Sequence, residues 1–352
     1  MNFLDGHLFP ENQQPLIITA APYAPGWLPS DFPEDIPVTM EEQIQKAVDC
    51  YNAGATVLHL HVRELDGKGS KRLSQFNELV AGVRKAVPEM IIQVGGSISF
   101  APESEGEAAK WLSDDTRHML AELEPTPDQV TVTVNTSQMN VTDHMEDGDI
   151  IGTSRENPKL FDTYKDMIVP AAPLWVEEHV RRLSAKGIQS AFQCYNTNSF
   201  ESVERLIRRG FYKGPLVMNW VAIGGGMDTP NVYSLGYFLR GIPDGAVVTV
   251  ESNVRNVLPV NMMGIAMGLH VRCGTEDVLW NQRRTAKQST VKQIEQLVRI
   301  SEEFGRDIAT ARQAREICRI GVFYETADEA LAANGFAPNR NGGNQGYLHK
   351  SR

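Results

Sequence analysis

The chain has 352 residues, of which 41% are hydrophobic and 22% are charged, as in a globular protein with a large core. Its net charge is −10 and no basic stripe stands out, so a nucleic-acid-binding protein is not expected. No apolar stretch approaches the ~20 residues that cross a bilayer, so a membrane protein is not expected either.

Short apolar runs alternate with amphipathic stretches along nearly the whole chain, which indicates alternating strands and helices. The predicted strands are Leu16–Ala21, Ala55–Val62, Met90–Val94, Gln129–Val134, Gln189–Cys194, Leu216–Ile223, Val247–Glu251 and His270–Cys273. The predicted helices are Thr39–Ala53, Ser74–Ala86, Glu105–Glu122, Pro173–Lys186, Ser199–Arg209, Pro259–Gly268 and Ser289–Phe304. The first helix opens with the Thr-x-x-Glu pattern of a capping box and stops before Gly54.

This alternation is interpreted as eight strand–helix units, which fit a closed (β/α)8 TIM barrel better than an open Rossmann sheet. No GxGxxG motif follows the first strand, which further weakens the dinucleotide-binding alternative. We predict one α/β domain over residues 1–352, with the barrel at about 15–317 and a C-terminal extension at 318–352. A polar insertion at 143–166, after the fourth strand, is longer than a usual loop. It either covers the site or extends an oligomer interface. The Asn- and Gly-rich tail from Ala337 is expected to be a flexible arm or part of a lid.

The second predicted strand ends in the run Leu58-His59-Leu60-His61-Val62-Arg63. Functional residues of such barrels lie at the carboxyl ends of strands, and side chains two residues apart share one face. Two adjacent imidazoles suit zinc or another divalent transition metal. The alternative is a pair of hydrogen-bonded histidines inside the barrel.

A third metal ligand is sought at the eighth strand, which is followed by Gly274-Thr275-Glu276-Asp277. In a closed barrel only the first strand separates the second from the eighth, so a carboxylate here can reach the two histidines. By themselves, these acids would also suit the N-terminus of a helix, where they would complement its dipole. Cys273 is a less favoured ligand.

Three motifs together resemble one family, the β-keto acid cleavage enzymes, whose type member cleaves 3-keto-5-aminohexanoate. These motifs are the runs His59–Arg63, His270–Asp277 and Gly305–Thr310, and the similarity extends over about Pro15–Ile317. The resemblance implies a zinc-containing (β/α)8 barrel with one Zn²⁺ per subunit, usually a homotetramer. It also implies a reaction between a β-keto acid and acetyl-CoA that gives acetoacetate and the CoA ester of the shortened acid.

The family's zinc ligands correspond to His59, His61 and Glu276 of this chain. Its catalytic aspartate corresponds to Asp277, which is expected to act as the general base. The nearby arginine corresponds to Arg272, which is expected to orient Asp277 and to offset charge that develops on oxygen. A barrel-wall salt bridge to Asp277 is the alternative role for this arginine.

The positions that contact substrate depart from the family. Thr131 matches a threonine that holds the substrate carboxylate, but the glutamate that receives the ammonium of the type substrate is missing from Pro22–Gly26. A serine after the third strand is replaced by Gly95, with Ser97 close enough to substitute for it. A glutamate at the end of the fifth strand is replaced by Gln193. An amino-bearing substrate is therefore not expected, and a neutral or hydrophobic keto acid is favoured.

Two further features are candidates for ligand contact. Gly225 lies in a Gly-Gly-Gly run after the sixth strand, where it either lets substrate approach the backbone or simply forms a tight turn. Arg255 follows the seventh strand and either meets the CoA phosphates or makes a subunit contact. The basic run Asn281–Arg284 is more typical of a solvated turn, but it stays open as a binding site for an anionic substrate.

A zinc hydrolase of the amidohydrolase type is the main alternative, because that class also carries an HxH motif in a barrel. Its motif lies at the first strand, however, and it needs further histidines at the ends of the fifth and sixth strands. A non-catalytic metal-containing subunit is the third possibility, and the presence of both Arg272 and Asp277 argues against it.

The remaining features favour a cytoplasmic protein. The four cysteines form no CxxC pair, so neither a disulfide framework nor a thiolate zinc site is expected. The N-terminal residues Met1–Gln14 lack the basic-then-apolar pattern of a signal peptide. The expected partners are the small-molecule β-keto acid, acetyl-CoA and further copies of the chain.

Overall fold

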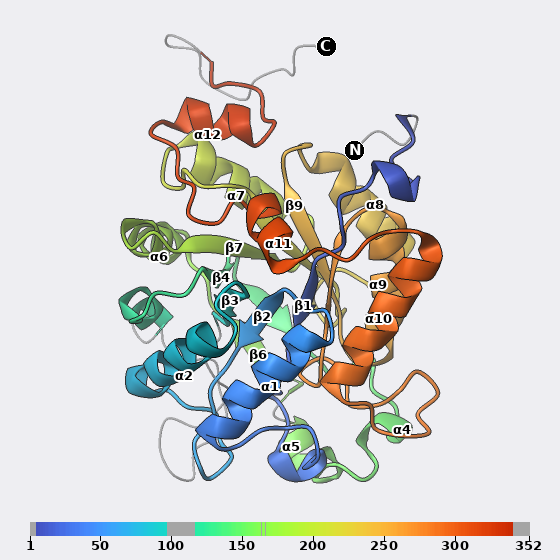
Figure 1. The fold of residues 1–352 in the computed structure, drawn as a ribbon. Helices are drawn as coiled ribbons and strands as arrows, with labels where there is room; N and C mark the ends of the chain where they lie inside the picture. Colours follow the sequence, from blue (N-terminus) through green and yellow to red (C-terminus); the bar gives the residue numbers. More distant parts are fainter. Residues whose placement is uncertain (1–4, 97–116, 163, 166, 341–352) are drawn as a thin grey trace.

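A computed structural model describes residues 5–96, 117–162, 164–165 and 167–340. Eight parallel strands close into a barrel in the order β1-β10-β9-β8-β7-β4-β3-β2, and helices surround it (Figure 1). The barrel strands are β1 (Ile18–Ala20), β2 (Val57–Leu60), β3 (Ile91–Val94), β4 (Gln129–Thr133), β7 (Gln189–Cys194), β8 (Val217–Val221), β9 (Val247–Glu251) and β10 (His270–Cys273). The predicted (β/α)8 barrel is confirmed.

The helices that follow the strands are α1 (Met40–Asn52), α2 (Leu73–Ala86), α6 (Pro173–Ala185), α7 (Ser199–Arg208), α8 (Val232–Gly241), α9 (Val257–Ala266) and α10 (Thr290–Phe304). Their apolar faces pack on the outer face of the barrel in one large core. The capping box of α1 is present, because Glu42 N donates to Thr39 Oγ1 at 3.2 Å and Thr39 N donates to Glu42 Oε2 at 2.9 Å.

A small apolar cluster fills the amino-terminal end of the barrel interior. Each of six strands supplies one side chain to it: Ile17, Val57, Ile91, Ala191, Val217 and Val247. Ala314, on the short helix α11 (Ala311–Ile317), joins this cluster together with Cys318. This end of the barrel is therefore closed by packing, which leaves the carboxyl ends of the strands to form the functional site.

Two segments differ from the sequence prediction. Helix α8 was not predicted, since its sequence contains Gly236 and aromatic residues of low helix propensity, and its Tyr233 and Tyr237 side chains are exposed. The predicted helix Glu105–Glu122 lies mostly outside the described residues, and its described end is a 3-10 turn, Met119–Glu122. None of the described helices is both long and apolar enough to cross a membrane.

The described part of the C-terminal extension packs against the barrel. Its helix α12 (Ala327–Ala333) lies beside α7. The fully buried Asn334 accepts a hydrogen bond from Leu216 N at 2.8 Å and donates to Gly214 O at 3.1 Å. The extension therefore packs around the segment that leads into β8.

The predicted insertion crosses the carboxyl end of the barrel. It contains the short helices α4 (Asp147–Ile150) and α5 (Pro158–Asp162), and the antiparallel strands β5 (Ser137–Met139) and β6 (Met167–Val169) flank it on either side. Arg284 binds Asp149 at 2.7 Å and Glu146 at 2.6 Å, and so ties the insertion to the loop after β10. This basic residue is occupied by a structural ion-pair network, which argues against the anion-binding alternative for its run.

Candidate metal and catalytic site

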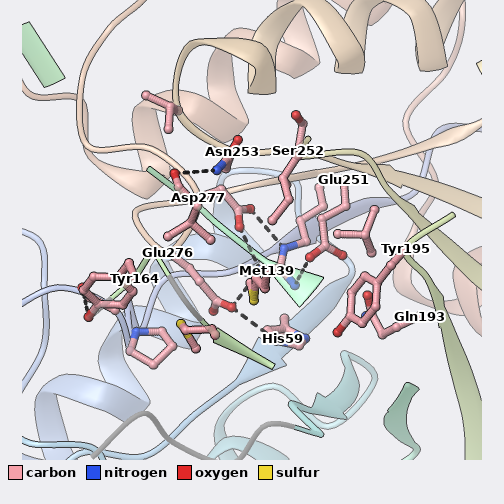
Figure 2. A pocket seen from close by; sticks show the side chains of 18 of the residues that line it. His59, Met139, Tyr164, Gln193, Tyr195, Glu251, Ser252, Asn253, Glu276 and Asp277 are labelled. Atoms are coloured by element: carbon pink, nitrogen blue, oxygen red, sulfur yellow. Dashed lines mark hydrogen bonds and ion pairs between the residues drawn. The ribbon is translucent and has the colours of Figure 1, made fainter. Parts of the chain in front are cut away.

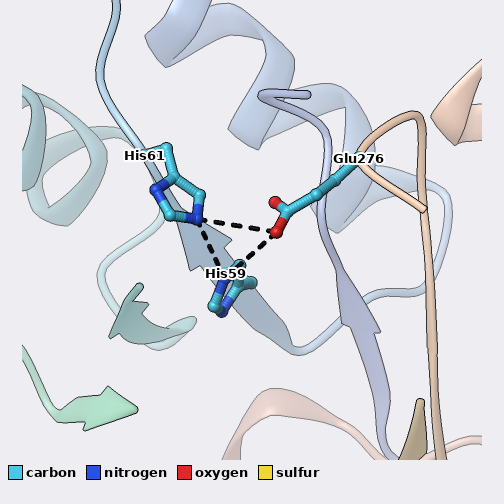
Figure 3. A group of neighbouring side chains, drawn as sticks. All are labelled: His59, His61 and Glu276. Carbon is cyan, nitrogen blue, oxygen red and sulfur yellow. Dashed lines mark hydrogen bonds and ion pairs between the residues drawn. The ribbon is translucent and has the colours of Figure 1, made fainter. Parts of the chain in front are cut away.

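Strands β2 and β10 bring the predicted metal ligands together. Both strands pair with β1, so their carboxyl ends flank a single strand of the barrel. Leu58 and Leu60 face the surrounding helices, whereas His59 and His61 point to the opposite side, as the alternation of a strand requires. Glu276 enters from the turn after β10, and Figure 3 shows the three side chains converging.

The distances among these side chains match a tetrahedral metal centre. The Nε2 atoms of His59 and His61 are 3.2 Å apart, and they lie 3.6 Å and 3.5 Å from Glu276 Oε1. Ligands about 2.1 Å from a tetrahedral ion are about 3.4 Å from one another. Among the described residues, these three side chains form the group that could hold a metal ion. The distances between their ligand atoms fit one divalent ion.

The charge states of His59 and Glu276 also suit a metal ion. Burial, and then the nearby Arg272, lower the pKa of His59 to about 3, so its imidazole is neutral at pH 7. Burial alone would raise the pKa of Glu276, but Arg272 and the two imidazoles hold it well below its usual range. Glu276 Oε2 is buried and has no hydrogen-bond partner in the part of the chain that the structure describes. Two imidazoles and one carboxylate are the ligand set of several catalytic zinc sites.

Two glycines make room for this arrangement. A Cβ at Gly95, which follows β3, would collide with the His61 ring and would also crowd His59 Nε2. Gly274 has a φ of +149° and lies so close to the Ala21 carbonyl that a side chain would not fit. The tight turn at Gly274 directs Glu276 toward the histidines. Gly95, which was read as a lost serine, is explained by the space that His61 needs.

Arg272 is the centre of a buried ion network beside the predicted metal ligands, and Figure 2 shows its carboxylate partners Glu251, Glu276 and Asp277. Its Nη2 donates to Glu276 Oε1 at 2.7 Å and to Asp277 Oδ1 at 2.8 Å, and its Nε donates to Asp277 Oδ2 at 3.0 Å. Its Nη1 lies 3.2 Å from Glu251 Oε1, at the carboxyl end of β9. The bidentate pair with Asp277 holds that carboxylate in a defined orientation.

The two carboxylates outside the predicted metal-ligand set, Asp277 and Glu251, bind protons more tightly than usual. Burial raises the pKa of Asp277 to about 6 and that of Glu251 to about 7, although Arg272 acts in the opposite direction on both. Carboxyl groups with pKa values near neutrality are suited to accept and return protons. Glu251 was not singled out from the sequence, yet its place at a strand end was the signal that could have found it.

A row of glutamines leads away from His59 through the barrel interior. His59 pairs in register with Gln93, Gln93 with Gln129, and Gln129 with Gln189. The side chains follow the same order, with separations of 2.9 Å, 2.9 Å and 2.6 Å, and Gln189 Nε2 then donates to the backbone carbonyl of Cys318 at 2.8 Å. We call these three residues the glutamine row.

The glutamine row determines which nitrogen of His59 carries the proton. The carbonyl at its far end can only accept, so each amide nitrogen donates toward that end and each amide oxygen accepts from the other side. Gln93 Oε1 therefore accepts from Nδ1–H of His59. The lone pair of Nε2 is left facing Glu276 and His61, which is the tautomer that a metal ligand requires.

A cavity opens over these groups at the carboxyl end of the barrel. Its lining includes His59, Glu251, Arg272, Glu276 and Asp277. The remaining lining is largely apolar and aromatic, and much of it comes from the insertion and from the loop after β1. The insertion was expected either to cover the site or to extend an oligomer interface, and its contribution to this lining supports the first alternative.

Comparison with known proteins now bears on the chain's identity. The family model of the beta-keto acid cleavage enzymes matches residues 15–320. The chain belongs to this family. It is 28% identical over 309 residues to the 3-keto-5-aminohexanoate cleavage enzyme of Acetoanaerobium sticklandii, an alignment that covers 87% of this chain and 98% of the relative. It is 26% identical over 310 residues to the 3-oxoadipate:acetyl-CoA acetyltransferase of Cupriavidus necator, covering 86% of this chain and 94% of that one.

A solved structure has a similar fold. The ternary complex of ObcA with a C4-CoA adduct and oxalate superimposes with a TM-score of 0.60 at 16% identity, covering 81% of this chain and 67% of that chain. The identity is low, so this likeness bears on the fold alone. Family membership identifies the chain as a beta-keto acid cleavage enzyme of the acetyl-CoA-dependent type, as its resemblance predicted. The chain is therefore assigned to this family rather than to the zinc hydrolases of the amidohydrolase type.

Of the substrate-binding residues predicted for this beta-keto acid cleavage enzyme, some line the cavity and others do not. Thr131 and Gln193 both line the cavity. Thr131 Oγ1 accepts a hydrogen bond from Gly96 N at 2.6 Å. Ser97 lies outside the described residues. Gly225 is not among the lining residues, and a Cβ there would collide with the Asn140 carbonyl, so packing against the insertion accounts for this glycine.

Proposed function

We propose that this beta-keto acid cleavage enzyme is zinc-dependent and converts a β-keto acid and acetyl-CoA into acetoacetate and the CoA ester of the shortened acid. The observation that carries the proposal is that two adjacent carboxylates after β10 face different partners. Glu276 faces His59 and His61, while the adjacent Asp277 is bound by Arg272.

His59, His61 and Glu276 are the proposed ligands of the ion. Bound there, zinc would act as a Lewis acid that polarises the 3-keto group of the substrate. Thr131 and Gln193 are proposed to bind the substrate at the cavity wall, because both are buried polar residues of that wall. Ser97 and Gly225 are kept as weaker candidates from the sequence alone.

Asp277 is proposed to be the general base. It would remove a proton from C2 of the keto acid, and the resulting carbanion would attack the thioester carbonyl of acetyl-CoA and release the CoA thiolate. That thiolate would then attack the original C3 carbonyl, the C2–C3 bond would break, and Asp277 would return its proton to C2. Atoms and charges balance, since one acyl group is exchanged for another. Arg272 would hold Asp277 in place and offset the charge that moves through it.

The proposal is tested by incubating the zinc-loaded protein with acetyl-CoA and a panel of β-keto acids and measuring acetoacetate. We expect equal amounts of acetoacetate and new acyl-CoA, and loss of both after chelation. Asp277→Asn should abolish turnover while bound zinc, measured by elemental analysis, stays unchanged. Absence of acetoacetate from every keto acid at full zinc content would refute the proposal. Loss of zinc in Asp277→Asn would assign that residue to the metal instead.

A homotetramer and a cytoplasmic location are retained as predictions from the family resemblance. Size-exclusion chromatography with light scattering measures the first directly.

A further inference from the structure

Arg155, in the insertion, is a buried cation that forms no ion pair with a carboxylate of the described residues. Only 6% of this residue is exposed. Its Nη1 donates to the Met145 sulfur at 3.2 Å and its Nη2 donates to the Gly26 carbonyl at 3.1 Å, whereas its Nε has no hydrogen-bond partner among the described residues. The Tyr164 side chain is a further, uncharged hydrogen-bond partner of the guanidinium. A thioether is a weak acceptor, so one end of this guanidinium is poorly satisfied.

Three other buried arginines, Arg63, Arg306 and Arg272, do not share this condition. Arg63 and Arg306 each donate to four backbone carbonyls, which satisfies most of their N–H groups. Arg272 faces three carboxylates. Asp31 lies within electrostatic range of Arg155, but it binds the backbone N–H groups of Leu28 and Ser154 rather than the guanidinium. An unsatisfied buried cation is costly, and such groups are typical of ligand sites.

The surroundings of Arg155 belong to the catalytic cavity. Its guanidinium carbon lies 3.6 Å from the centroid of the Trp27 ring and 4.5 Å from that of Tyr164, so the two rings hold its plane. Trp27, Met145, Arg155 and Tyr164 all line the cavity that also contains Glu276. A fixed, planar guanidinium is suited to bind a carboxylate with two parallel hydrogen bonds.

The other charges of the cavity leave this cation for the substrate. Among its lining residues the carboxylates are Glu251, Glu276 and Asp277, and all three bind Arg272. Among the described lining residues no carboxylate is left to receive a substrate ammonium, in agreement with the sequence. The favoured neutral substrate, however, would leave Arg155 unpaired.

We propose that Arg155 binds a second, distal carboxylate of the substrate, so that the enzyme acts on β-keto dicarboxylic acids. The inference rests on the proposed function of the same cavity. A distal carboxylate would take the position opposite Nη1 that the Met145 sulfur now occupies. The diphosphate of CoA is the other possible source of an anion. It is the weaker candidate, because its several charges need a wide, wet site and Arg155 is enclosed by two aromatic rings.

The test compares two six-carbon keto acids that differ only at the far end, 3-oxohexanedioate and 3-oxohexanoate. The seven- and eight-carbon pairs cover other chain lengths. The wild-type enzyme should prefer the dicarboxylate. Arg155→Met should raise the KM for the dicarboxylate roughly 10- to 100-fold, the range expected for a lost charged hydrogen bond, and leave the monocarboxylate within about threefold. Arg155→Lys should restore part of the preference.

Arg284→Met is the matched control, because Arg284 also holds the insertion but does not line the cavity. It should affect both substrates equally. An equal loss on both substrates in Arg155→Met would overturn the inference and make Arg155 a clamp for the insertion. A raised KM for acetyl-CoA alone would overturn it in favour of the CoA phosphates.

Binding of 3-oxohexanedioate, measured by calorimetry without acetyl-CoA, separates this inference from the proposed function. Tight binding to the wild type and weak binding to Arg155→Met would support the carboxylate site even if no acetoacetate were formed. Equal binding to both proteins would contradict it whatever the activity.

Discussion

His59 and His61 are positioned by a small neighbour as much as by strand alternation. Gly95 leaves the space that the His61 ring occupies, since a Cβ there would overlap the ring. Replacing Gly95 with Ala should therefore displace His61 and weaken zinc binding about tenfold or more, in line with other changes that reorient a metal ligand.

Competition with a chromophoric chelator measures this change in affinity. Gly152→Ala is a control for the substitution itself, because nothing lies within 4 Å of a Cβ at Gly152, although its positive φ disfavours alanine. Unchanged zinc affinity in Gly95→Ala would contradict the steric role.

Glu251 provides a prediction of pH dependence. Its pKa rises from an ordinary value of 4.5 to about 7 on folding, chiefly because it is buried. Between these values the folded protein keeps a proton that the unfolded chain releases. The stabilisation is therefore complete below about pH 4.5 and is lost as the pH rises through 7.

Glu251→Gln should remove this pH dependence, which amounts to roughly 3 kcal/mol at most. Urea unfolding of the metal-free wild type and variant at pH 5 and pH 7.5 measures the difference in slope. Parallel pH profiles for the two proteins would contradict the assignment.

For individual residues, the sequence was informative where residue type and position alone restrict the chemistry. An HxH pair at a strand end and a Glu-Asp pair after another strand are unusual enough to indicate a site. Arg155 could not be found in this way, because its significance depends on the missing carboxylate partner, which only the tertiary structure reveals.

The glutamine row lies on three neighbouring strands, β3, β4 and β7, and connects them to His59, the proposed metal ligand on β2. Because its direction is determined by the Cys318 carbonyl, it keeps His59 in the tautomer that presents Nε2 to the ion. Gln93→Leu should remove the acceptor for Nδ1–H and weaken zinc binding roughly 10-fold, as other losses of partners of metal-bound histidines do.

The same substitution at Gln189 is the control at the far end of the row. It should weaken zinc binding less, because two amides remain between it and His59. Equal affinity in the wild type and Gln93→Leu would contradict an orienting role for the row.

Secondary structure was predictable where the local pattern and the packing agree. The capping box of α1 and the short apolar strands are examples, since both depend on neighbouring residues. Helix α8 was missed because its helical conformation depends on packing against the barrel through Leu235 and Phe238 rather than on its propensity. The glutamine row was missed because register between strands is set by the closed barrel.

For the whole molecule, a metal ion would couple the site to folding. The ligands come from segments more than 200 residues apart, which are adjacent only when the barrel is closed. Chelation should therefore lower the melting temperature by several degrees, and added zinc should restore it, because a ligand that binds only the folded state stabilises it.

Differential scanning calorimetry with and without a chelator measures this change. His61→Ala should melt at the same temperature under both conditions. A wild-type protein whose melting temperature does not respond to chelation would contradict a bound metal at this site.

The central claim is best tested by following carbon from acetyl-CoA labelled with ¹³C at both acetyl positions. The proposed exchange predicts acetoacetate labelled at C3 and C4, with C1 and C2 from the keto acid, and an unlabelled new acyl-CoA. Mass spectrometry and ¹³C NMR distinguish these positions. Unlabelled acetoacetate, or a labelled acyl-CoA without acetoacetate, would contradict the account.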